Sequence, residues 1–344
     1  MVFMKDKVSS KSNGPTVSVV VPNWNGKDVI GDCLKSLQKQ SYKLAQVIVV
    51  ENGSVDGSIE YIEKNFPEVI LLKQPKNLGF AGGVNVGIKA AQENKSDYVW
   101  LLNNDATADK DCLKNLLRTA TKQSADIVAS VILTRNDTII DSDGDTYGMY
   151  GLPFPRHRNA PANQVPKADE PIVSASGGAS LYKTSLFDEI GYFDEMFFAY
   201  YEDVDLSMRA QLQGKKIWLS HNAIVHHRMN HTADRIPGFG QEMTIKNSIY
   251  LFWKIIPFPL ILRVFPRFLY ANWRVTAITA LRGHPWRAVR AHLVAAWHTP
   301  QLMRARKQIQ GSRTISPKEL EALLDKRNPF RALKKLDRST PKSK

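Results

Sequence analysis

Residues 103–105 have the sequence Asn-Asn-Asp and directly follow the apolar run Tyr98–Leu102. Such a run is typical of a buried strand, and open α/β folds bind ligands at the carboxyl ends of their strands. Asp105 would supply the hard oxygen ligand that suits Mg²⁺ or Mn²⁺ shared with a diphosphate. Asn and Asp also favour turns, so the triplet alone is equally typical of a plain turn.

Two other groups of reactive side chains follow about a hundred residues later, the acidic run Glu202–Asp205 and the pair His226-His227. Together with Asp105 they would provide a metal ligand, a base and an imidazole, which is a set suited to group transfer. The acids also fit the first turn of a helix, where carboxylates are common. A zinc site built from the histidines between 221 and 231 is disfavoured, because tetrahedral sites normally include cysteine or regular spacing.

The elements that must position these groups alternate between short β-branched runs and helical patterns. This alternation predicts an α/β fold with a mostly parallel sheet and helices on both of its faces. Residues 134–171 interrupt the alternation and are rich in Pro, Gly, Asp and Asn, and a loop of that length is usually functional. We expect strands at Val17–Val21, Gln46–Val50, Val69–Leu72, Tyr98–Leu102 and Ile127–Leu133.

Polar residues follow each of the first four predicted strands. These strand ends should share one edge of the sheet, and four polar ends in series are harder to explain as chance turns than one. Glu51 could accept a hydrogen bond from the imide N–H of a pyrimidine base, although an exposed loop acid is an equal alternative. The candidate donor-binding residues at this edge are Pro22, Asn23, Asn25, Glu51, Asn52, Asn77, Asn103 and Asn104.

The glycine-rich stretch Gly79–Gly83 matches neither the dinucleotide fingerprint G-x-G-x-x-G nor the phosphate loop G-x-x-x-x-G-K-[ST]. Hydride transfer and P-loop phosphoryl transfer therefore lose support. We expect Gly82 to let the backbone approach a sugar or ribose, with Asn85 pointing inward. Simple helix packing is the alternative explanation for these glycines.

The charge of the chain is unevenly distributed. Residues 1–240 carry 26 Lys and Arg against 28 Asp and Glu, whereas residues 241–344 carry 21 against 5. We therefore expect a disordered tail at 1–15, a catalytic domain at 16–240, a basic helical region at 241–325 and a basic tail at 326–344. Aromatic and aliphatic residues alternate with arginines up to about Arg306, which predicts two or three helices with apolar stripes.

The basic region has three possible interpretations. An anionic membrane surface is favoured, because basic helices rich in aromatics suit the lipid interface. Nucleic-acid binding is not expected, since no DNA- or RNA-binding motif accompanies the charge. The remaining alternative is a helical subdomain that packs on the catalytic domain or forms a homodimer. The side chains expected at headgroup level are Phe258, Phe265, Phe268, Trp273 and Trp286.

Cysteine content and hydropathy indicate the compartment. Cys33 and Cys112 are too few for a disulfide framework, and we expect both to be small core residues in a reducing cytosol. No uncharged apolar run is long enough to span a bilayer. We therefore expect a cytoplasmic protein that binds peripherally to the inner face of the cell membrane.

Several long segments resemble glycosyltransferase family 2, and the similarity runs in order through residues 16–230. It is strongest to the rhamnosyltransferase-like branch of bacterial and archaeal surface-polysaccharide enzymes. The resemblance implies a GT-A fold, a nucleotide-sugar donor, a divalent metal and inversion at the anomeric carbon. It also implies a dTDP- or UDP-sugar, with dTDP-rhamnose foremost, and a lipid-linked or cell-surface glycan acceptor. The segments are VSVVVPNWNG, VVENGSVDGS, NLGFAGGVN, LLNNDA and GYFDEMFFAYYEDVDLSMR.

Carried onto this sequence, the resemblance assigns Asp203 as general base with Glu202 beside it. Asp105 would bind the metal, and His227, with His226 as the alternative, would complete the metal or diphosphate site. Gly178 and Tyr201 are expected on the acceptor side.

The chain departs from the family pattern at two positions. Glu51 stands where the family usually has a base-binding Asp, and Asn103 replaces the first acid of the metal-binding Asp-x-Asp motif. These departures leave open a different class of function, a non-catalytic protein that binds nucleotides or glycans on the same fold. The retained Asp105 and Asp203 argue against that alternative. A nucleotidyltransferase is a weaker one, because no glycine- and lysine-rich loop follows the first strand.

Overall fold

The computed structural model describes residues 14–134, 136–228 and 236–327. Most of the two predicted tails, at 1–13 and 328–344, and His231 therefore lie outside the described residues. All five predicted strands form, and each begins within one residue of its predicted start. No helix in the described part of the chain is long and apolar enough to cross a membrane.

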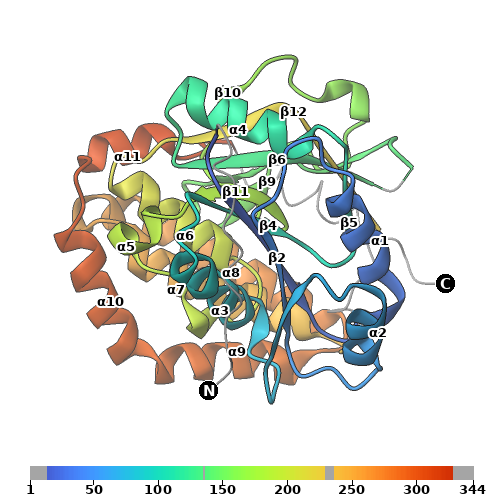
Figure 1. Ribbon diagram of the computed structural model, residues 1–344. Coiled ribbons are helices and arrows are strands. Elements are labelled where there is room, and N and C mark those ends of the chain that lie inside the picture. The colour runs from blue at the N-terminus through green and yellow to red at the C-terminus, as the bar shows by residue number, and fades with distance from the viewer. Residues whose placement is uncertain (1–13, 135, 229–235, 328–344) are drawn as a thin grey trace.

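The molecule is built around a central sheet (Figure 1). Within the described residues the main strand order of this sheet is β10-β12-β6-β11-β4-β1-β2-β3. Neighbouring strands β1, β2, β3 and β4 pair in parallel, as do β6 and β12, whereas β11 runs antiparallel between β4 and β6. The mostly parallel sheet is thus confirmed. The strands are β1 Val17–Asn23, β2 Gln46–Glu51, β3 Ile70–Lys73, β4 Tyr98–Leu102, β6 Ile127–Thr134, β10 Glu170–Pro171, β11 Ala179–Lys183 and β12 Ile217–His227.

Helices cover both faces of the sheet because the β-branched strands are apolar on both sides. Alternate residues of β1 enter different cores: Val19 packs with α1 and α4, and Val20 packs with α3 and α6. Cys33 and Cys112 are both fully buried in the first core, as expected. The helices are α1 Lys27–Gln38, α2 Ser58–Asn65, α3 Gly79–Glu93, α4 Cys112–Gln123, α5 Leu186–Ile190 and α6 Glu202–Leu212.

The interrupted region at 134–171 is built from short pieces rather than from one open loop. Strand β7 (Ile140–Ser142) pairs with β6, and β8 (Asp145–Tyr147) forms a hairpin with β9 (Pro153–Pro155). A short strand, β5 (Ala106–Ala108), follows the Asn-Asn-Asp triplet and pairs with the end of β12. A 3₁₀ turn, η1, covers Ala162–Gln164. These pieces bring the acidic residues 141–145 toward the carboxyl ends of the strands.

The described residues after 238 form five helices, where two or three were expected. Proline occupies the first turn of α8, α9, α10 and α11, which is the helical position that proline favours. The long apolar pattern is therefore divided more often than its periodicity suggests. The helices are α7 Phe239–Ile255, α8 Phe258–Leu281, α9 Pro285–Trp297, α10 Thr299–Gly311 and α11 Pro317–Leu323.

These helices share a core with the catalytic domain. Phe197 and Val204, from the predicted catalytic domain, pack with Tyr250 and Phe252 of α7. The predicted boundary at residue 240 therefore crosses continuous packing, although the division into domains stays a prediction. In Figure 1 the red helices α10 and α11 lie on the side of the molecule where α5 and α6 are, opposite α1 and α2.

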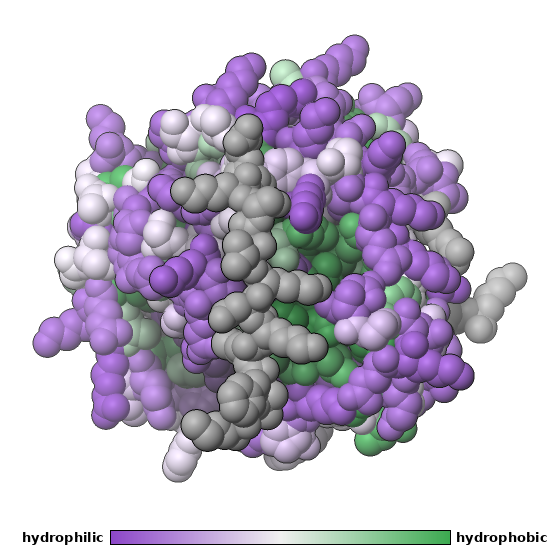
Figure 2. Space-filling view, viewed as in Figure 1, coloured by the Kyte–Doolittle hydropathy of each residue, from purple (hydrophilic) through white to green (hydrophobic). Residues whose placement is uncertain are grey.

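Two of the side chains expected at a membrane surface belong to this core instead. Phe268 is 4% exposed and stacks on Phe252 with ring centroids 4.3 Å apart. Phe265 is partly buried against the same cluster. The placement of Phe268 at headgroup level was wrong, because the buried face of α8 needs this ring to pack on α7. Most of the surface in Figure 2 is hydrophilic, and hydrophobic surface gathers mainly in a hollow near the middle of the view.

Candidate active site

The carboxyl ends of β1, β2 and β4 are joined by side-chain hydrogen bonds. Asn23 Nδ2 donates to Glu51 Oε2 at 2.7 Å, and Asn104 Nδ2 donates to Asn23 Oδ1 at 2.7 Å. Ser54 N–H donates to the other Glu51 oxygen at 3.1 Å. Glu51 and Asn23 are both 0% exposed, so Glu51 here positions its neighbours. Its direct contact with a base stays a prediction that requires these loops to move.

The other asparagines of this edge shape the loops that follow the strands. Asn52 Nδ2 donates to Asn77 Oδ1 at 3.1 Å and to the Gly79 carbonyl at 2.9 Å. Asn25 accepts from Val55 N–H, and its own N–H donates to the Ser54 hydroxyl. Pro22 is partly exposed beside them. The predicted strand ends therefore do meet, and their contacts with a donor stay predictions.

The glycine-rich start of α3 packs against the chain that leads to α6. A Cβ on Gly79 would lie 2.4 Å from the carbonyl oxygen of Phe198, and one on Gly82 would lie 2.7 Å from the Cβ of Leu78. These glycines thus permit close packing, which was the alternative reading. Their approach to a sugar stays a prediction.

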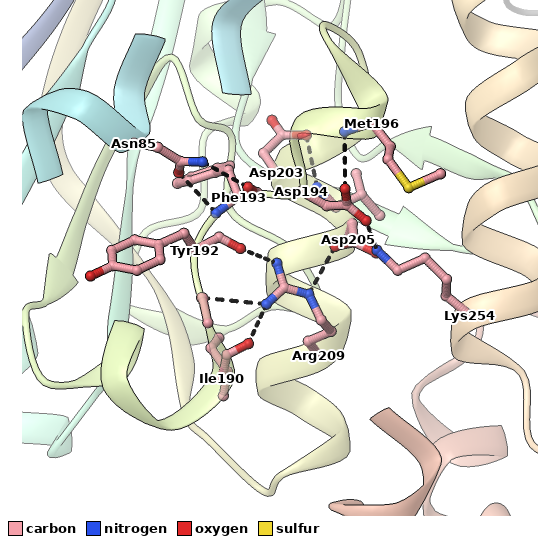
Figure 3. Close-up of polar contacts among 12 residues, drawn as sticks. Asn85, Ile190, Tyr192, Phe193, Asp194, Met196, Asp203, Asp205, Arg209 and Lys254 are labelled. Carbon is pink, nitrogen blue, oxygen red and sulfur yellow. Dashed lines mark hydrogen bonds and ion pairs between the residues drawn. The ribbon is translucent and has the colours of Figure 1, made fainter. Parts of the chain in front are cut away.

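The side-chain amide of Asn85 in α3 forms its hydrogen bonds within the protein. Its amide exchanges hydrogen bonds with the backbone of Phe193 at 2.8 and 3.1 Å, and it is 3% exposed. Figure 3 shows these two bonds beside the loop that leads to Asp194. Asn85 therefore anchors this loop, and a direct contact with a donor stays a prediction.

Asp105 and His227 meet at the ends of β4 and β12. His227 Nε2 lies 3.0 Å from Asp105 Oδ1, and His227 Nδ1 lies 2.8 Å from Asp141 Oδ2. Burial alone would lower the pKa of His227, but the hydrogen bonds to the two carboxylates outweigh it and raise the pKa to about 10. His226 turns away and pairs instead with Asp109 and Asp137. Of the two histidines, only His227 joins this site.

Asp203 lies at the start of α6 and is partly exposed. Its two carboxylate oxygens accept hydrogen bonds from Gly177 N–H and Val204 N–H, both at 2.8 Å. Burial raises the pKa of Asp203, and these N–H donors oppose the rise. The acids at the start of α6 were expected there. In addition, the carboxylate of Asp203 is fixed in one orientation.

Glu202 differs from its neighbour. It is 6% exposed, and its Oε2 is buried without a hydrogen-bond partner. Burial and the charge of Asp203 raise the pKa of Glu202 to about 8. Glu202 therefore holds its proton to higher pH than an exposed glutamic acid does.

A tight turn connects the candidate base to Asn103, at the strand end that leads to the candidate metal ligand Asp105. Gly177 N–H binds Asp203, and the carbonyl of the next residue, Gly178, accepts from Asn103 N–H at 2.9 Å. A Cβ on Gly178 would lie 3.1 Å from the Asn103 amide nitrogen. Tyr201 precedes α6 in a left-handed conformation with φ 70°. The acceptor-side roles of Gly178 and Tyr201 stay predictions.

Two acids of this site were missed by sequence reasoning. Asp141 binds His227, and it also lies 3.1 Å from Arg158. Burial and the charge of Asp203 raise the pKa of Asp145 to about 7. The available signal was the recurrence of Asp at every second residue from 141 to 145, inside the region expected to be functional.

A mostly parallel sheet whose strand ends gather acids, amides and an imidazole is typical of an α/β protein that binds its ligand at that edge. The family model for glycosyl transferase family 2 matches residues 18–191, about half of the chain. The chain therefore belongs to glycosyl transferase family 2 and is a glycosyltransferase.

Two named relatives each match more than half of the chain. An N-acetylglucosaminyl-diphospho-decaprenol L-rhamnosyltransferase of Mycobacterium tuberculosis is 28% identical over 227 residues, which span 59% of this chain and 73% of that enzyme. A low-salt glycan biosynthesis hexosyltransferase of Haloferax volcanii is 24% identical over 58% of this chain and 63% of its own length. The match thus spans less than two thirds of the haloarchaeal enzyme.

Solved structures identify the fold as GT-A. A mannosyltransferase of Pyrobaculum calidifontis, in complex with GDP-Man and Mn²⁺, superimposes with a TM-score of 0.51 at 16% identity, covering 87% of this chain and 85% of that one. Staphylococcus aureus TarS 1-349 in complex with UDP gives a TM-score of 0.51 at 17% identity, covering 86% and 90%.

Proposed function

We propose that this protein transfers a sugar from a dTDP- or UDP-sugar to a hydroxyl of a lipid-linked or cell-surface glycan, with inversion. The mycobacterial relative is named for transfer of L-rhamnose to a lipid-diphosphate sugar, which makes dTDP-rhamnose the first donor to test. A poly(ribitol-phosphate) beta-glucosyltransferase of Bacillus spizizenii, 26% identical over 59% of this chain and 31% of its own length, supports a cell-surface glycan as the other acceptor class.

The observation that carries this proposal is the Gly177–Gly178 turn between Asp203 and Asn103. It places an oriented carboxylate next to the strand end that would hold the donor diphosphate. Each oxygen of Asp203 accepts one N–H, so lone pairs remain for the proton of an acceptor hydroxyl. A base on one side of the sugar and a leaving diphosphate on the other is the arrangement for a single displacement, which inverts the anomeric carbon.

Asp105 and His227 are suited to a divalent cation that arrives with the donor. The described part of the chain has no group of three or more His, Cys, Asp or Glu side chains arranged to hold a metal alone. One carboxylate, and one imidazole that gives up its proton when the metal binds, fit a Mg²⁺ or Mn²⁺ ion whose other ligands are water and diphosphate oxygens. When bound, the cation would neutralise charge on the departing diphosphate.

We also propose that helices α8 and α9, which pack together, bind an anionic membrane surface at the inner face of the cell membrane. Exposed apolar residues of α8 recur on one side of the helix: Phe258 70%, Leu262 70%, Leu269 51% and Trp273 65%. Trp286, Leu293 and Trp297 form a similar stripe on α9, exposed by 67%, 58% and 79%. The net positive charge of residues 241–344 complements anionic lipid, and a second copy of the chain is the alternative occupant.

Release of nucleoside diphosphate tests the enzyme against the non-catalytic alternative. The full-length protein is incubated with dTDP-rhamnose or UDP-sugars, Mg²⁺ or Mn²⁺, and an extract of polyprenyl-linked glycans. We expect acceptor-dependent release of dTDP or UDP. A protein that is stabilised by dTDP or UDP in a thermal shift assay, and yet releases none from any donor, would be a binding protein instead.

A further inference from the structure

The chain segment that delivers Asp203 has a strained backbone. Phe198, Tyr200 and Tyr201 have φ values of 66°, 68° and 70°, in the left-handed region that bulky residues rarely adopt. Asp203 follows two residues after the last of them. Such a conformation persists only when the surrounding structure holds it.

Side chains of helix α7 hold this segment by donating hydrogen bonds to the segment's backbone carbonyls. The Nδ2 atom of Asn247 lies 3.1, 2.8 and 2.6 Å from the carbonyl oxygens of Phe197, Ala199 and Tyr200. Asn247 is 0% exposed, and its two amide hydrogens are shared among these three acceptors. The neighbouring Lys246 donates to the carbonyls of Met196 at 3.0 Å and Phe197 at 3.4 Å.

A buried lysine of the same helix also forms an ion pair on either side of the segment. Lys254 Nζ lies 2.6 Å from Asp194, before the segment, and 2.6 Å from Asp205, after it, and the lysine side chain is 1% exposed. Arg209 Nε binds Asp205 at 2.8 Å, while its Nη2 donates to the Tyr192 carbonyl at 2.7 Å. Figure 3 shows Lys254 reaching Asp194 and Asp205 beside the fan of bonds from Arg209.

The polar side chains Lys246, Asn247 and Lys254 lie on the same side of α7 as Tyr250 and Leu251, which pack the helix into a core. Burying a polar side chain costs free energy unless the side chain forms hydrogen bonds. The partners of Lys246 and Asn247 are the backbone carbonyls of the strained segment. An apolar α7 would leave those carbonyls without hydrogen bonds.

We propose that Asn247 is a positioning residue for sugar transfer: it holds the Phe197–Tyr201 segment in the conformation that aims the carboxylate of Asp203. The inference rests on the proposed role of Asp203 as base. Helix α7, although it lies beyond the matched family region, is then part of the catalytic machinery.

Hydrogen exchange of the full-length protein tests the positioning role of Asn247 without a sugar donor. Gly177 N–H and Val204 N–H both donate to Asp203, so their exchange reports where its carboxylate lies. We expect Asn247→Ala to speed exchange in peptides covering these amides by about tenfold or more. The control Ser248→Ala removes a 1% exposed hydroxyl that binds Ile245 and Asn272 instead of the segment, and should leave these peptides unchanged.

Unchanged protection in a folded Asn247→Ala protein would overturn the inference, as would an equal effect of Ser248→Ala. Asn247→Ser is measured in parallel. A hydroxyl donates one hydrogen where the amide donated two, so it should show the same direction of change if the alanine variant does not fold.

Kinetics then separate this inference from the proposed function. With dTDP-rhamnose or the UDP-sugar found active, Asn247→Ala should lower kcat by about tenfold or more and leave the donor KM within about threefold. In an Asp203→Asn background the same change should have little further effect, because Asn247 acts through Asp203. Undiminished turnover by Asp203→Asn alone would refute the base assignment, while the exchange result would still stand. A full additional loss in the double variant would refute the inference alone.

Discussion

Glu202 is the residue whose ionisation should be visible in the stability of the protein. It is faced by Asp203 and Asp205 of its own helix and by Lys246 of α7, and burial with the Asp203 charge raises its pKa to about 8. The folded state therefore binds a proton that the unfolded chain has already released between about pH 4.5 and pH 8. Stability from this group is present at low pH and is lost as pH rises toward the folded pKa.

Glu202→Gln should remove that pH dependence, because the amide resembles the neutral acid in shape and cannot ionise. Relative to the parent, the variant should gain free energy of unfolding between pH 6 and pH 9, on the order of 1 kcal/mol. Urea unfolding at several pH values measures this difference, and Glu60→Gln on the exposed surface of α2 serves as control. A difference that does not grow with pH would contradict the raised pKa.

Asp105 should couple nucleotide binding to the metal. Asp105→Ala is expected to weaken binding of dTDP and UDP by about tenfold or more in Mg²⁺ or Mn²⁺, and to have little effect in chelator. Titration calorimetry with and without EDTA measures both affinities, and Asp188→Ala on the exposed surface of α5 is the control. Equal losses in metal and in chelator would show that Asp105 acts on the fold rather than on the cation.

The sequence could indicate Asp105, Asp203 and His227 as candidates because each lies at a strand end or helix start, and their roles stay predictions. It could not predict that Asn85 binds the backbone of Phe193, because that contact joins residues 108 positions apart. The same holds for the pairing of Asp141 with His227 across 86 positions. Such partners are set by tertiary packing, which leaves no local pattern.

At the scale of elements, the apolar pattern of the sequence was sufficient to predict the strands of the sheet. It was insufficient to predict the C-terminal helices. The five predicted strands begin within one residue of their observed starts, because a buried strand is a short and bounded apolar run. The helices after residue 238 have apolar residues on two sides, one for the core and one exposed, which blurs a single stripe. Phe268 was assigned to the wrong side for that reason.

Truncation tests how α7 contributes to the fold. A chain ending at residue 240 loses Tyr250 and Phe252 from the core around Phe197 and Val204, and leaves Asp194 and Asp205 without the Lys254 charge. We expect it to be insoluble or to lack cooperative unfolding, since breaking a buried ion pair is strongly destabilising. A chain ending at 327 is the control and should unfold as the full-length protein does. A cooperative 1–240 fragment of near-parental Tm would contradict this account.

For the whole molecule, the charge asymmetry and the exposed stripes of α8 and α9 predict binding to anionic vesicles. Vesicles containing phosphatidylglycerol should bind the full chain more tightly than phosphatidylcholine vesicles, and high salt should release part of it. Trp273→Ala combined with Trp286→Ala should weaken binding about tenfold or more, whereas Val55→Ala, 90% exposed on the catalytic domain, should not. Equal binding to neutral and anionic vesicles, or a concentration-dependent dimer, would favour a protein partner for this face.

The central claim is that Asp203 takes the acceptor proton at a site built from the sheet edge and α7, and one kinetic comparison tests it most directly. Turnover and donor affinity are measured for the full-length parent and for Asp203→Asn, with the donor that supports nucleoside diphosphate release. The account predicts that kcat falls by about 10²–10⁴-fold while the Kd for dTDP or UDP is nearly unchanged, because the lost carboxylate acts on the acceptor hydroxyl. A variant that keeps near-parental kcat would contradict it.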